Sequence, residues 1–280
     1  MPIAPIPLPR AGGLSMPSVG IGTWRIGEGA RPRADEVAAL RHAHALGFRH
    51  FDTAEMYGDG RAEEVLGEAM RGLDRDGLFL VSKVYPWNAG AGDIRRSCEA
   101  SLARLGTDRL DLYLLHWPGS IPFEETLDGM RALRDDGRIR AFGISNFDAD
   151  DLAHLEEAGL ADEIAVNQVM HNIPERGIEV DLLPMMKAAG IACVAYSPLE
   201  AAPLCRIPDM RDLAEEVGLT MPQFSLAWHV TRGVSVPIPK SGDPAHLDEL
   251  RDAVDVTLPA SVLERVDALA PPRQGALAIR

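Results

Sequence analysis

The sequence of 280 residues is poor in cysteine, with Cys98, Cys193 and Cys205 far apart along the chain. Three widely spaced cysteines indicate neither a disulfide framework nor a paired-cysteine zinc site, so we expect plain thiols. His42 and His44 form the only H-x-H pattern, and their spacing on a helix points the two rings in different directions. No metal site is therefore predicted.

Positive charge is also scarce, since 28 lysines and arginines stand against 42 acidic residues and give a net charge of −14. That balance disfavours a nucleic-acid or anionic-membrane surface, and any anionic cofactor must be held by local donors. No apolar run approaches the roughly 18 residues of a membrane span, and the start of the chain lacks the features of a signal peptide. We expect a cytoplasmic enzyme that binds neither nucleic acid nor membrane.

The chain repeats one theme, a short β-rich run followed by a polar break and a helical segment with apolar residues three and four apart. Strands are expected at 19–22, 48–52, 78–83, 110–116, 139–145, 164–168, 192–196 and 234–238. Helices are expected at 34–46, 61–70, 94–105, 123–135, 149–157, 179–189, 210–217 and 222–231. Eight strands, each followed by a helix, predict an α/β fold of the closed (β/α)8 TIM-barrel type.

The remaining segments fit around such a barrel. The Pro- and Gly-rich start, roughly residues 6–19, is expected to form an N-terminal hairpin that closes the barrel floor, and residues 261–269 an extra C-terminal helix. No interdomain linker is apparent, so residues 1–280 are predicted to form a single domain. Glu63 and Glu64 are expected on a solvated helix face.

Four polar residues stand where strand-like runs end, namely Asp52, Tyr57, Lys83 and His116. The carboxyl ends of parallel barrel strands meet on one face, so these side chains can converge there. Singly, three of them have another interpretation: Asp52 could cap a helix, Tyr57 could be a loop aromatic and His116 a core histidine. Lys83 at the end of an apolar strand is harder to explain otherwise, because a lysine near a core needs a partner. Together, an acid, a phenol, an amine and an imidazole predict a proton donor with the groups that tune it.

Several motifs in register carry a resemblance that spans essentially the whole chain. These motifs are DTAEMYGDG, VSK, LDLYLLHWP, GISNF, NQV, YSPL and IPKS. In this order they resemble the aldo-keto reductase superfamily, and DTAEMYGDG, VSKVYPWNAG and RGIEVDLLP are most similar to its bacterial methylglyoxal and aldehyde reductase branch. The resemblance implies reduction of aldehydes or ketones to alcohols by hydride transfer from NADPH, with NADH possible as the donor. It also implies a monomer.

The resemblance implies a role for each of the four polar residues. Tyr57 would give the proton to the carbonyl oxygen, and Lys83 would supply the positive charge that lowers the pKa of the tyrosine. Asp52 would hold Lys83 and keep it charged, while His116 would hydrogen-bond the carbonyl oxygen and orient it.

The same resemblance implies which residues bind the cofactor. The absence of a G-x-G-x-x-G sequence argues against a Rossmann mode of binding. Ser145, Asn146 and Gln168 match positions that hydrogen-bond the nicotinamide amide, and Tyr196 matches the aromatic residue on which the ring stacks. The other expected cofactor residues are Gly22, Thr23 and Trp24 after the first strand, Ser197 and Leu199 along the pyrophosphate, and Lys240 and Ser241 at the adenosine 2′-phosphate.

The 2′-phosphate pocket departs from the family pattern. His246 stands where many members have an arginine that grips the phosphate, and Leu250 stands where many have an asparagine near adenine. Histidine is a weaker and pH-dependent substitute for a guanidinium, so the preference for NADPH over NADH is expected to be smaller than usual. Glu249 still matches an acid that contacts adenine, and we include His246 and Glu249 among the cofactor residues.

The substrate pocket is expected to be apolar and open. Trp24, Trp87 and Trp117 follow the first, third and fourth strands and would wall the cleft beside His116, while residues 200–208 form only a short loop. Small aldehydes and α-ketoaldehydes such as methylglyoxal are the expected substrates. A keto-sugar or diketogulonate-type reductase and a weakly catalytic NADPH-binding regulatory subunit remain the alternatives, whereas the strand ends suit neither a metal hydrolase nor a glycosidase.

Overall fold

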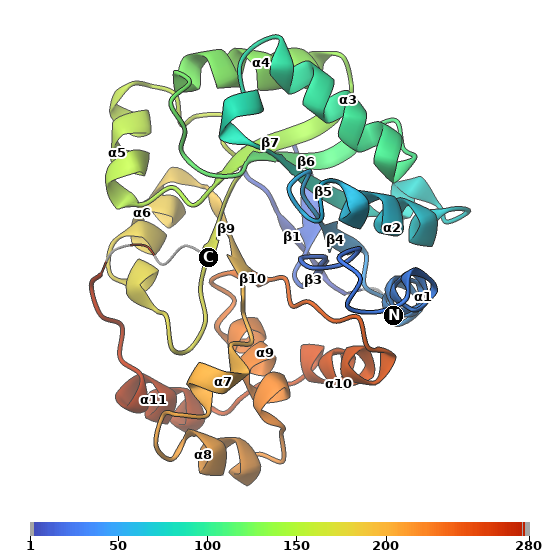
Figure 1. Ribbon diagram of the computed structural model, residues 1–280. Coiled ribbons are helices and arrows are strands. Elements are labelled where there is room, and N and C mark those ends of the chain that lie inside the picture. The colour runs from blue at the N-terminus through green and yellow to red at the C-terminus, as the bar shows by residue number, and fades with distance from the viewer. Residues whose placement is uncertain (1–2, 276, 278–280) are drawn as a thin grey trace.

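The structure, a computed structural model that describes residues 3–275 and 277, is built on a sheet of eight parallel strands (Figure 1). Each strand pairs with the next along the chain, from β3 to β10. The strands are β3 (Gly20–Gly22), β4 (His50–Asp52), β5 (Phe79–Val84), β6 (Leu110–Leu115), β7 (Ile139–Ser145), β8 (Val166–Met170), β9 (Ala192–Tyr196) and β10 (Val236–Pro237). The predicted barrel is confirmed.

Glycine on β3 allows the barrel to close against the segment that follows β10. The Gly22 amide donates to the Pro239 carbonyl at 2.9 Å. A Cβ at Gly22 would stand 3.1 Å from the Ile238 carbonyl oxygen, and one at Gly20 would stand 2.9 Å from the Ile238 side chain. Only residues without a side chain let the two edges approach this closely.

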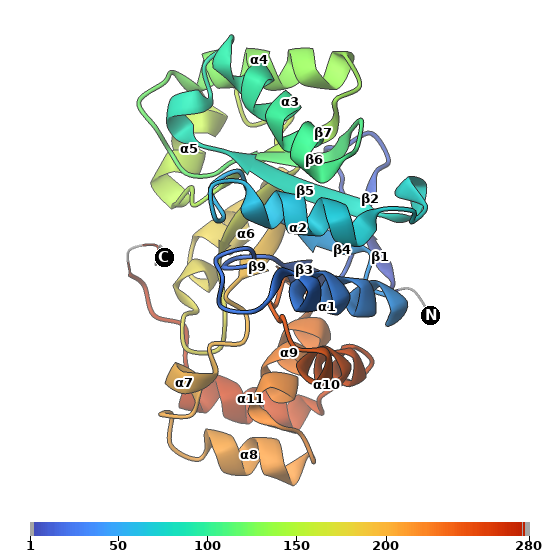
Figure 2. The ribbon, with the colours of Figure 1, turned by 45° about the vertical axis from the view of Figure 1, so that its right-hand side comes forward.

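Helices cover the outside of the strands (Figure 2). The helices that follow the barrel strands β3 to β9 are α1 (Arg33–Ala45), α2 (Arg61–Met70), α3 (Asp93–Leu105), α4 (Phe123–Asp135), α5 (Ala149–Glu157), α6 (Leu182–Ala189), α7 (Ala201–Leu204), α8 (Met210–Glu216) and α9 (Met221–Arg232). The chain ends with α10 (Pro244–Val254) and α11 (Ala260–Leu269). No helix among the described residues is long and apolar enough to cross a bilayer.

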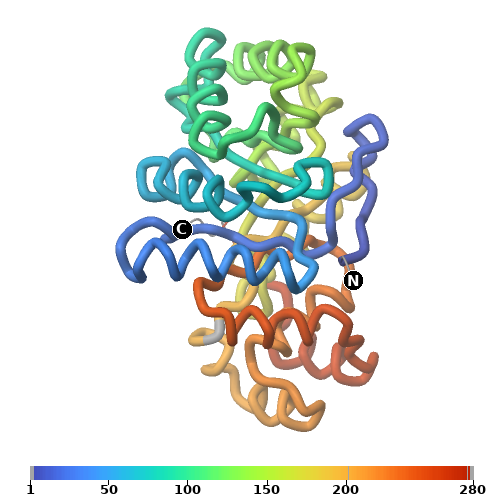
Figure 3. The backbone as a smooth tube through the Cα atoms, turned by 90° about the vertical axis from the view of Figure 1, so that its right-hand side faces the viewer, coloured from blue at the N-terminus to red at the C-terminus, as the bar shows by residue number. Residues whose placement is uncertain are grey.

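The predicted N-terminal hairpin is present as β1 (Pro5–Pro7) and β2 (Ser15–Pro17), which pair antiparallel. Figure 3 shows it at one end of the barrel. Its buried side chains, among them Leu8 and Met16, join one apolar cluster with Phe79 and Leu112 of the barrel strands. The hairpin therefore extends the core past the amino ends of the strands, away from the expected site.

Two features differ from the sequence-based expectations. Helix α10 was not predicted, although Asp243 caps it by accepting the Ala245 amide at 3.0 Å and Leu250 is buried on its inner face. Glu63 is buried rather than solvated, because Ser82 and Arg104 each donate to its carboxylate at 2.6 Å. The cap and the apolar spacing of α10 are local signals that the sequence analysis overlooked, whereas the partners of Glu63 are distant in sequence and leave no local pattern.

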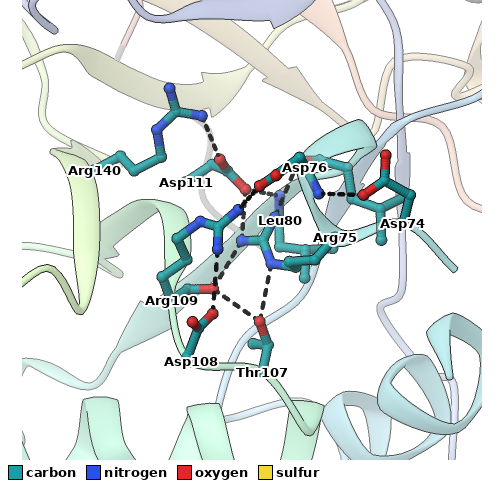
Figure 4. A network of polar contacts seen from close by, with 10 residues as sticks. Asp74, Arg75, Asp76, Leu80, Thr107, Asp108, Arg109, Asp111 and Arg140 are labelled. Carbon is teal, nitrogen blue, oxygen red and sulfur yellow. Dashed lines mark hydrogen bonds and ion pairs between the residues drawn. The ribbon is translucent and has the colours of Figure 1, made fainter. Parts of the chain in front are cut away.

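A polar network ties the amino ends of the middle strands together (Figure 4). At its centre is Asp111 of β6, whose side chain is 1% exposed. One carboxylate oxygen accepts from Arg75 at 2.8 Å and from the Leu80 amide at 2.9 Å, and the other accepts from Arg140 at 3.0 Å. Arg75 belongs to the turn η1 (Arg75–Gly77), so one carboxylate joins this turn to β5, β6 and β7.

We expect the substitution Asp111→Ala to lower the free energy of unfolding by about 3 kcal/mol, because it leaves buried donors without their acceptor. Asp76→Ala is the matched control, since Asp76 pairs with Arg109 in the same network but is 85% exposed. Its loss should change stability little. Urea unfolding of both variants checks this, and equal losses would contradict a special role for Asp111.

Candidate active site

A cavity opens at the carboxyl ends of the strands and gathers most of the residues singled out by the sequence. Twelve expected site residues line it, namely Gly22, Thr23, Trp24, Asp52, Tyr57, His116, Ser145, Asn146, Gln168, Tyr196, Ser197 and Lys240. Met56, Pro198 and Ile238 also line it and were not predicted. Each of these three stands beside or near a predicted residue in the sequence, which was the only available signal.

Lys83 lies beneath this cavity, and its fully buried ammonium has three partners. Its Nζ contacts Asp52 Oδ1 at 2.5 Å and donates to the Thr53 carbonyl at 2.9 Å and to the Tyr57 hydroxyl at 3.1 Å. An ammonium has three protons, and these three partners use all of them. The position of the tyrosine hydroxyl is therefore fixed by a charged donor that cannot rotate away.

The second carboxylate oxygen of Asp52 extends the hydrogen-bond network from β4 to β8. It accepts from Gln168 Nε2 at 2.8 Å, and the Gln168 backbone carbonyl accepts from the Ser145 hydroxyl at 2.8 Å. The Thr23 hydroxyl donates to the Asp52 carbonyl at 3.0 Å. Thr23, which follows β3, and residues within β4, β7 and β8 are thus held in one hydrogen-bonded set.

Burial and charge act against each other on the pKa values of Lys83 and Tyr57. Burial alone would lower the pKa of Lys83, but the charges of Asp52 and Tyr57 outweigh it, so the pKa is raised and the ammonium stays charged. Burial raises the pKa of Tyr57, and the nearby Lys83 lowers it without reversing that rise. Lys83 therefore acts on the Tyr57 pKa in the expected downward direction, while the net shift of that pKa is upward because burial is the larger effect.

His116 stands beside the tyrosine as a neutral imidazole. Burial, with a smaller contribution from the charge of Lys83, lowers the pKa of His116 to about 2. The rings of His116 and Tyr57 meet edge to face with centroids 5.8 Å apart. Within the described part of the chain, the buried His116 Nδ1 has no hydrogen-bond partner. One ring nitrogen of a neutral imidazole is a donor and the other an acceptor, so His116 can donate to an oxygen without carrying charge.

The opposite wall is set by Asn146 and Tyr196. The Tyr196 hydroxyl donates to Asn146 Oδ1 at 2.8 Å, and Asn146 Nδ2 donates to the His116 carbonyl at 3.0 Å. Asn146 and Ser197 directly follow β7 and β9 and have positive φ angles of 62° and 49°. Left-handed non-glycine residues concentrate at functional sites, where the surrounding structure maintains their strain. The hydrogen bond to Asn146 therefore fixes the position of the Tyr196 ring in this wall of the cavity.

The tryptophans expected to wall the cleft lie at two sides of it. Trp24 lines the cavity and is 42% exposed. Trp117 packs on His116 with ring centroids 4.8 Å apart, and Trp87 lies 5.7 Å from Trp117. Trp87 and Trp117 do not line the cavity. They are connected to it by the contact between Trp117 and His116.

Four expected cofactor residues do not line the cavity: Leu199, Ser241, His246 and Glu249. The Ser241 hydroxyl faces the start of α10, where it donates to the Asp243 carbonyl at 3.2 Å. His246 is exposed on α10, and the Glu249 carboxylate accepts a hydrogen bond from Thr220. Their roles toward a cofactor stay predictions.

Comparison with known proteins gives a consistent result. The model of the Aldo/keto reductase family matches residues 18–271. Methylglyoxal reductase YeaE of Escherichia coli (strain K12) is 43% identical over 274 residues, which cover 96% of each chain. Glyoxal reductase of Bacillus subtilis (strain 168) is 34% identical over 261 residues, 92% of this chain and 90% of that protein.

Solved structures agree with the sequence relatives. An aldo/keto reductase from Klebsiella pneumoniae in complex with NADP and acetate superposes with a TM-score of 0.91 at 42% identity, covering 96% of this chain and 98% of that one. A second Klebsiella pneumoniae aldo-keto reductase, in complex with NADPH, gives a TM-score of 0.92 at 41% identity over 99% of this chain and 100% of its own.

The ionisation of Tyr57 tests the electrostatics of the cavity. We expect Tyr57 to lose its proton only above about pH 10, the ordinary value for tyrosine, because burial raises its pKa. Lys83→Met should move the titration to still higher pH, since the charge that lowers the pKa is removed while Asp52 remains. The difference in tyrosinate absorbance between each protein and its Tyr57→Phe counterpart isolates this residue. Titration near neutral pH would contradict the arrangement.

Proposed function

Because the chain belongs to the aldo/keto reductase family, we propose that it reduces small aldehydes such as methylglyoxal to alcohols with NADPH, and that Tyr57 is the proton donor. One observation carries this proposal: a buried, charged lysine donates to a tyrosine hydroxyl that faces the cavity beside a neutral histidine. A structural core does not require a lysine, a tyrosine and a histidine in this arrangement, whereas reduction of a carbonyl requires a proton donor and groups that tune it.

Each of the four polar residues has a separate role when the carbonyl oxygen of the substrate receives its proton. Tyr57 Oη holds the proton that the oxygen receives, and Lys83 stabilises the tyrosinate that remains. His116 donates a hydrogen bond that orients the oxygen toward Tyr57 and stabilises the negative charge as it develops. Asp52 keeps Lys83 charged and in place, so that the stabilising charge is present before the reaction begins.

The donor set of the cavity fits a nicotinamide cofactor. When bound, a reduced nicotinamide supplies the hydride that reaches the carbonyl carbon. Tyr196 presents a ring whose hydroxyl is anchored on Asn146, which suits stacking, and Ser145 and Gln168 place polar groups beside it. Lys240, which lines the same cavity, is the cation for the 2′-phosphate. Complexes of related enzymes with NADP and NADPH support this assignment.

The walls of the cavity favour small and largely apolar carbonyl compounds. Trp24 and Met56 line it without adding charge, and the segment after β9 lines it with Ser197 and Pro198, which are also uncharged. A keto-sugar acid would need a cation for its carboxylate, and the one lysine or arginine that lines the cavity among the described residues is Lys240, which the cofactor would use. The name of the Escherichia coli relative also favours methylglyoxal.

We expect Tyr57→Phe to lower kcat for methylglyoxal reduction by roughly a hundredfold or more, the usual contribution of a positioned general acid. The affinity for NADPH should change little, because the ring remains and only the hydroxyl is lost. The decrease in NADPH absorbance gives the rate, and quenching of tryptophan fluorescence gives the binding. Methylglyoxal, an aromatic aldehyde and a keto-sugar acid should be compared, with NADPH and with NADH.

Two other outcomes would contradict the proposal. Tight binding of NADPH without turnover of any carbonyl would favour a regulatory subunit. Equal loss of binding and turnover in Tyr57→Phe would remove Tyr57 as the proton donor.

A further inference from the structure

We propose that Glu55 is a positioning residue that determines which carbonyl substrates the cavity accepts, by holding an aromatic wall made of Tyr85, Trp87 and Trp117. The inference rests on the proposed reduction at Tyr57 and adds a specificity determinant to it. Glu55 does not line the cavity, so its effect must pass through the groups that it holds.

A single oxygen of Glu55 holds both ends of the turn that carries the wall. Oε1 accepts from the Tyr85 amide at 2.7 Å and from Asn88 Nδ2 at 3.1 Å. These two residues flank Pro86 and Trp87 in the turn η2 (Pro86–Asn88), which follows β5. Because both donors converge on one carboxylate, the direction in which the turn leaves the barrel depends on Glu55.

The aromatic wall extends from the proton donor to the surface. Tyr85 stacks on Trp87 with ring centroids 4.3 Å apart and an angle of 20° between the planes. Trp117 meets both edge to face, at 5.8 Å from Tyr85 and 5.7 Å from Trp87. Trp117 in turn packs on His116, which contacts Tyr57. The wall itself does not line the cavity, so a substrate oriented by His116 meets it only where the substrate extends beyond the cavity, past His116.

Burial does not hold the outer part of the wall. Trp87 is 60% exposed, so it gains little from the hydrophobic effect. The loop that follows Trp117 contacts the turn closely, because a Cβ on Gly119 would stand 2.5 Å from Pro86 Cβ. The position of this loop is therefore coupled by close packing to that of the turn, which Glu55 anchors.

The position of Glu55 also joins the wall to the proton donor. Glu55 precedes Tyr57 by two residues on the loop after β4, and its amide donates to the Lys83 carbonyl at 3.3 Å. Aromatic contacts stabilise a bound ring beyond the effect of burial alone. An aromatic aldehyde carries a ring that can extend toward the wall, whereas methylglyoxal has only three carbons and no ring. Loss of the anchor should therefore affect the two substrates unequally.

The test compares Glu55→Ala with Glu55→Gln, using 4-nitrobenzaldehyde and methylglyoxal as substrates and NADPH as the donor. We expect Glu55→Ala to raise KM for 4-nitrobenzaldehyde roughly three- to tenfold, the range of an aromatic contact. Methylglyoxal kinetics and NADPH affinity should stay within about twofold of wild type. Glu55→Gln keeps an acceptor oxygen and should restore most of the selectivity.

Three further variants keep the test decisive. Trp87→Ala should reproduce the effect of Glu55→Ala, and the double variant should be no worse than either single one if the two act as a unit. Asn88→Ala removes one of the two hydrogen bonds at a partly exposed site, and should shift selectivity less in the same direction even if Glu55→Ala fails to fold. Glu64→Ala on the exposed face of α2 is the matched control and should change neither substrate.

The outcomes separate this inference from the proposed function. Equal changes for both aldehydes in Glu55→Ala, or no change in Asn88→Ala and Trp87→Ala, would overturn the role of Glu55 while leaving the reductase intact. Absence of carbonyl turnover in the wild-type protein would instead overturn the proposed function, and the inference with it.

Discussion

The buried ion pair between Lys83 and Asp52 is the interaction on which the functional end of the barrel depends. An ammonium removed from water is costly unless it is paired and hydrogen-bonded, and Lys83 is 0% exposed with three partners. Two adjacent strands in register place the pair, since Asp52 ends β4 and Lys83 lies on β5. The second oxygen of Asp52 then fixes Gln168 on β8, so the pair organises both the proton donor and the far wall of the cavity.

The two ends of the barrel separate stability from chemistry. At the amino ends of the strands, Asp111 satisfies donors from several segments at once, and the hairpin adds apolar core. At the carboxyl ends, the structure retains features that cost stability, including His116 Nδ1, which has no partner among the described residues, and the left-handed Asn146 and Ser197. A well-supported floor allows the opposite face to keep a charged lysine and a neutral histidine close together.

Much of the fold and of the site could be predicted because both follow local rules. Alternating β-rich and helical segments predicted the barrel, and polar residues directly after apolar runs predicted the cavity that contains Asp52, Tyr57 and His116. Features that depend on distant contacts were missed. Glu63 resembles a solvated acid until Arg104 is seen beside it, and Glu55 has no signal in the sequence because its partners lie on another loop. Lys83 lowers the pKa of Tyr57 as expected, but burial, which a sequence does not quantify, outweighs this effect and makes the net shift upward. The single domain, the monomeric state and the cytoplasmic location stay predictions.

The rate of NADPH oxidation in a single turnover of Asp52→Asn with methylglyoxal tests the dependence on this ion pair most directly. Asparagine has nearly the same shape and can still accept from Lys83, but it lacks the negative charge and has one acceptor oxygen where Asp52 has two. If the charge of Asp52 keeps Lys83 protonated and Gln168 in place, the rate should fall at least tenfold, about 1.4 kcal/mol in the barrier, while the protein stays folded by circular dichroism. A rate within about twofold of wild type would show that the Lys83–Tyr57 contact functions without its carboxylate partner, and would contradict the central claim.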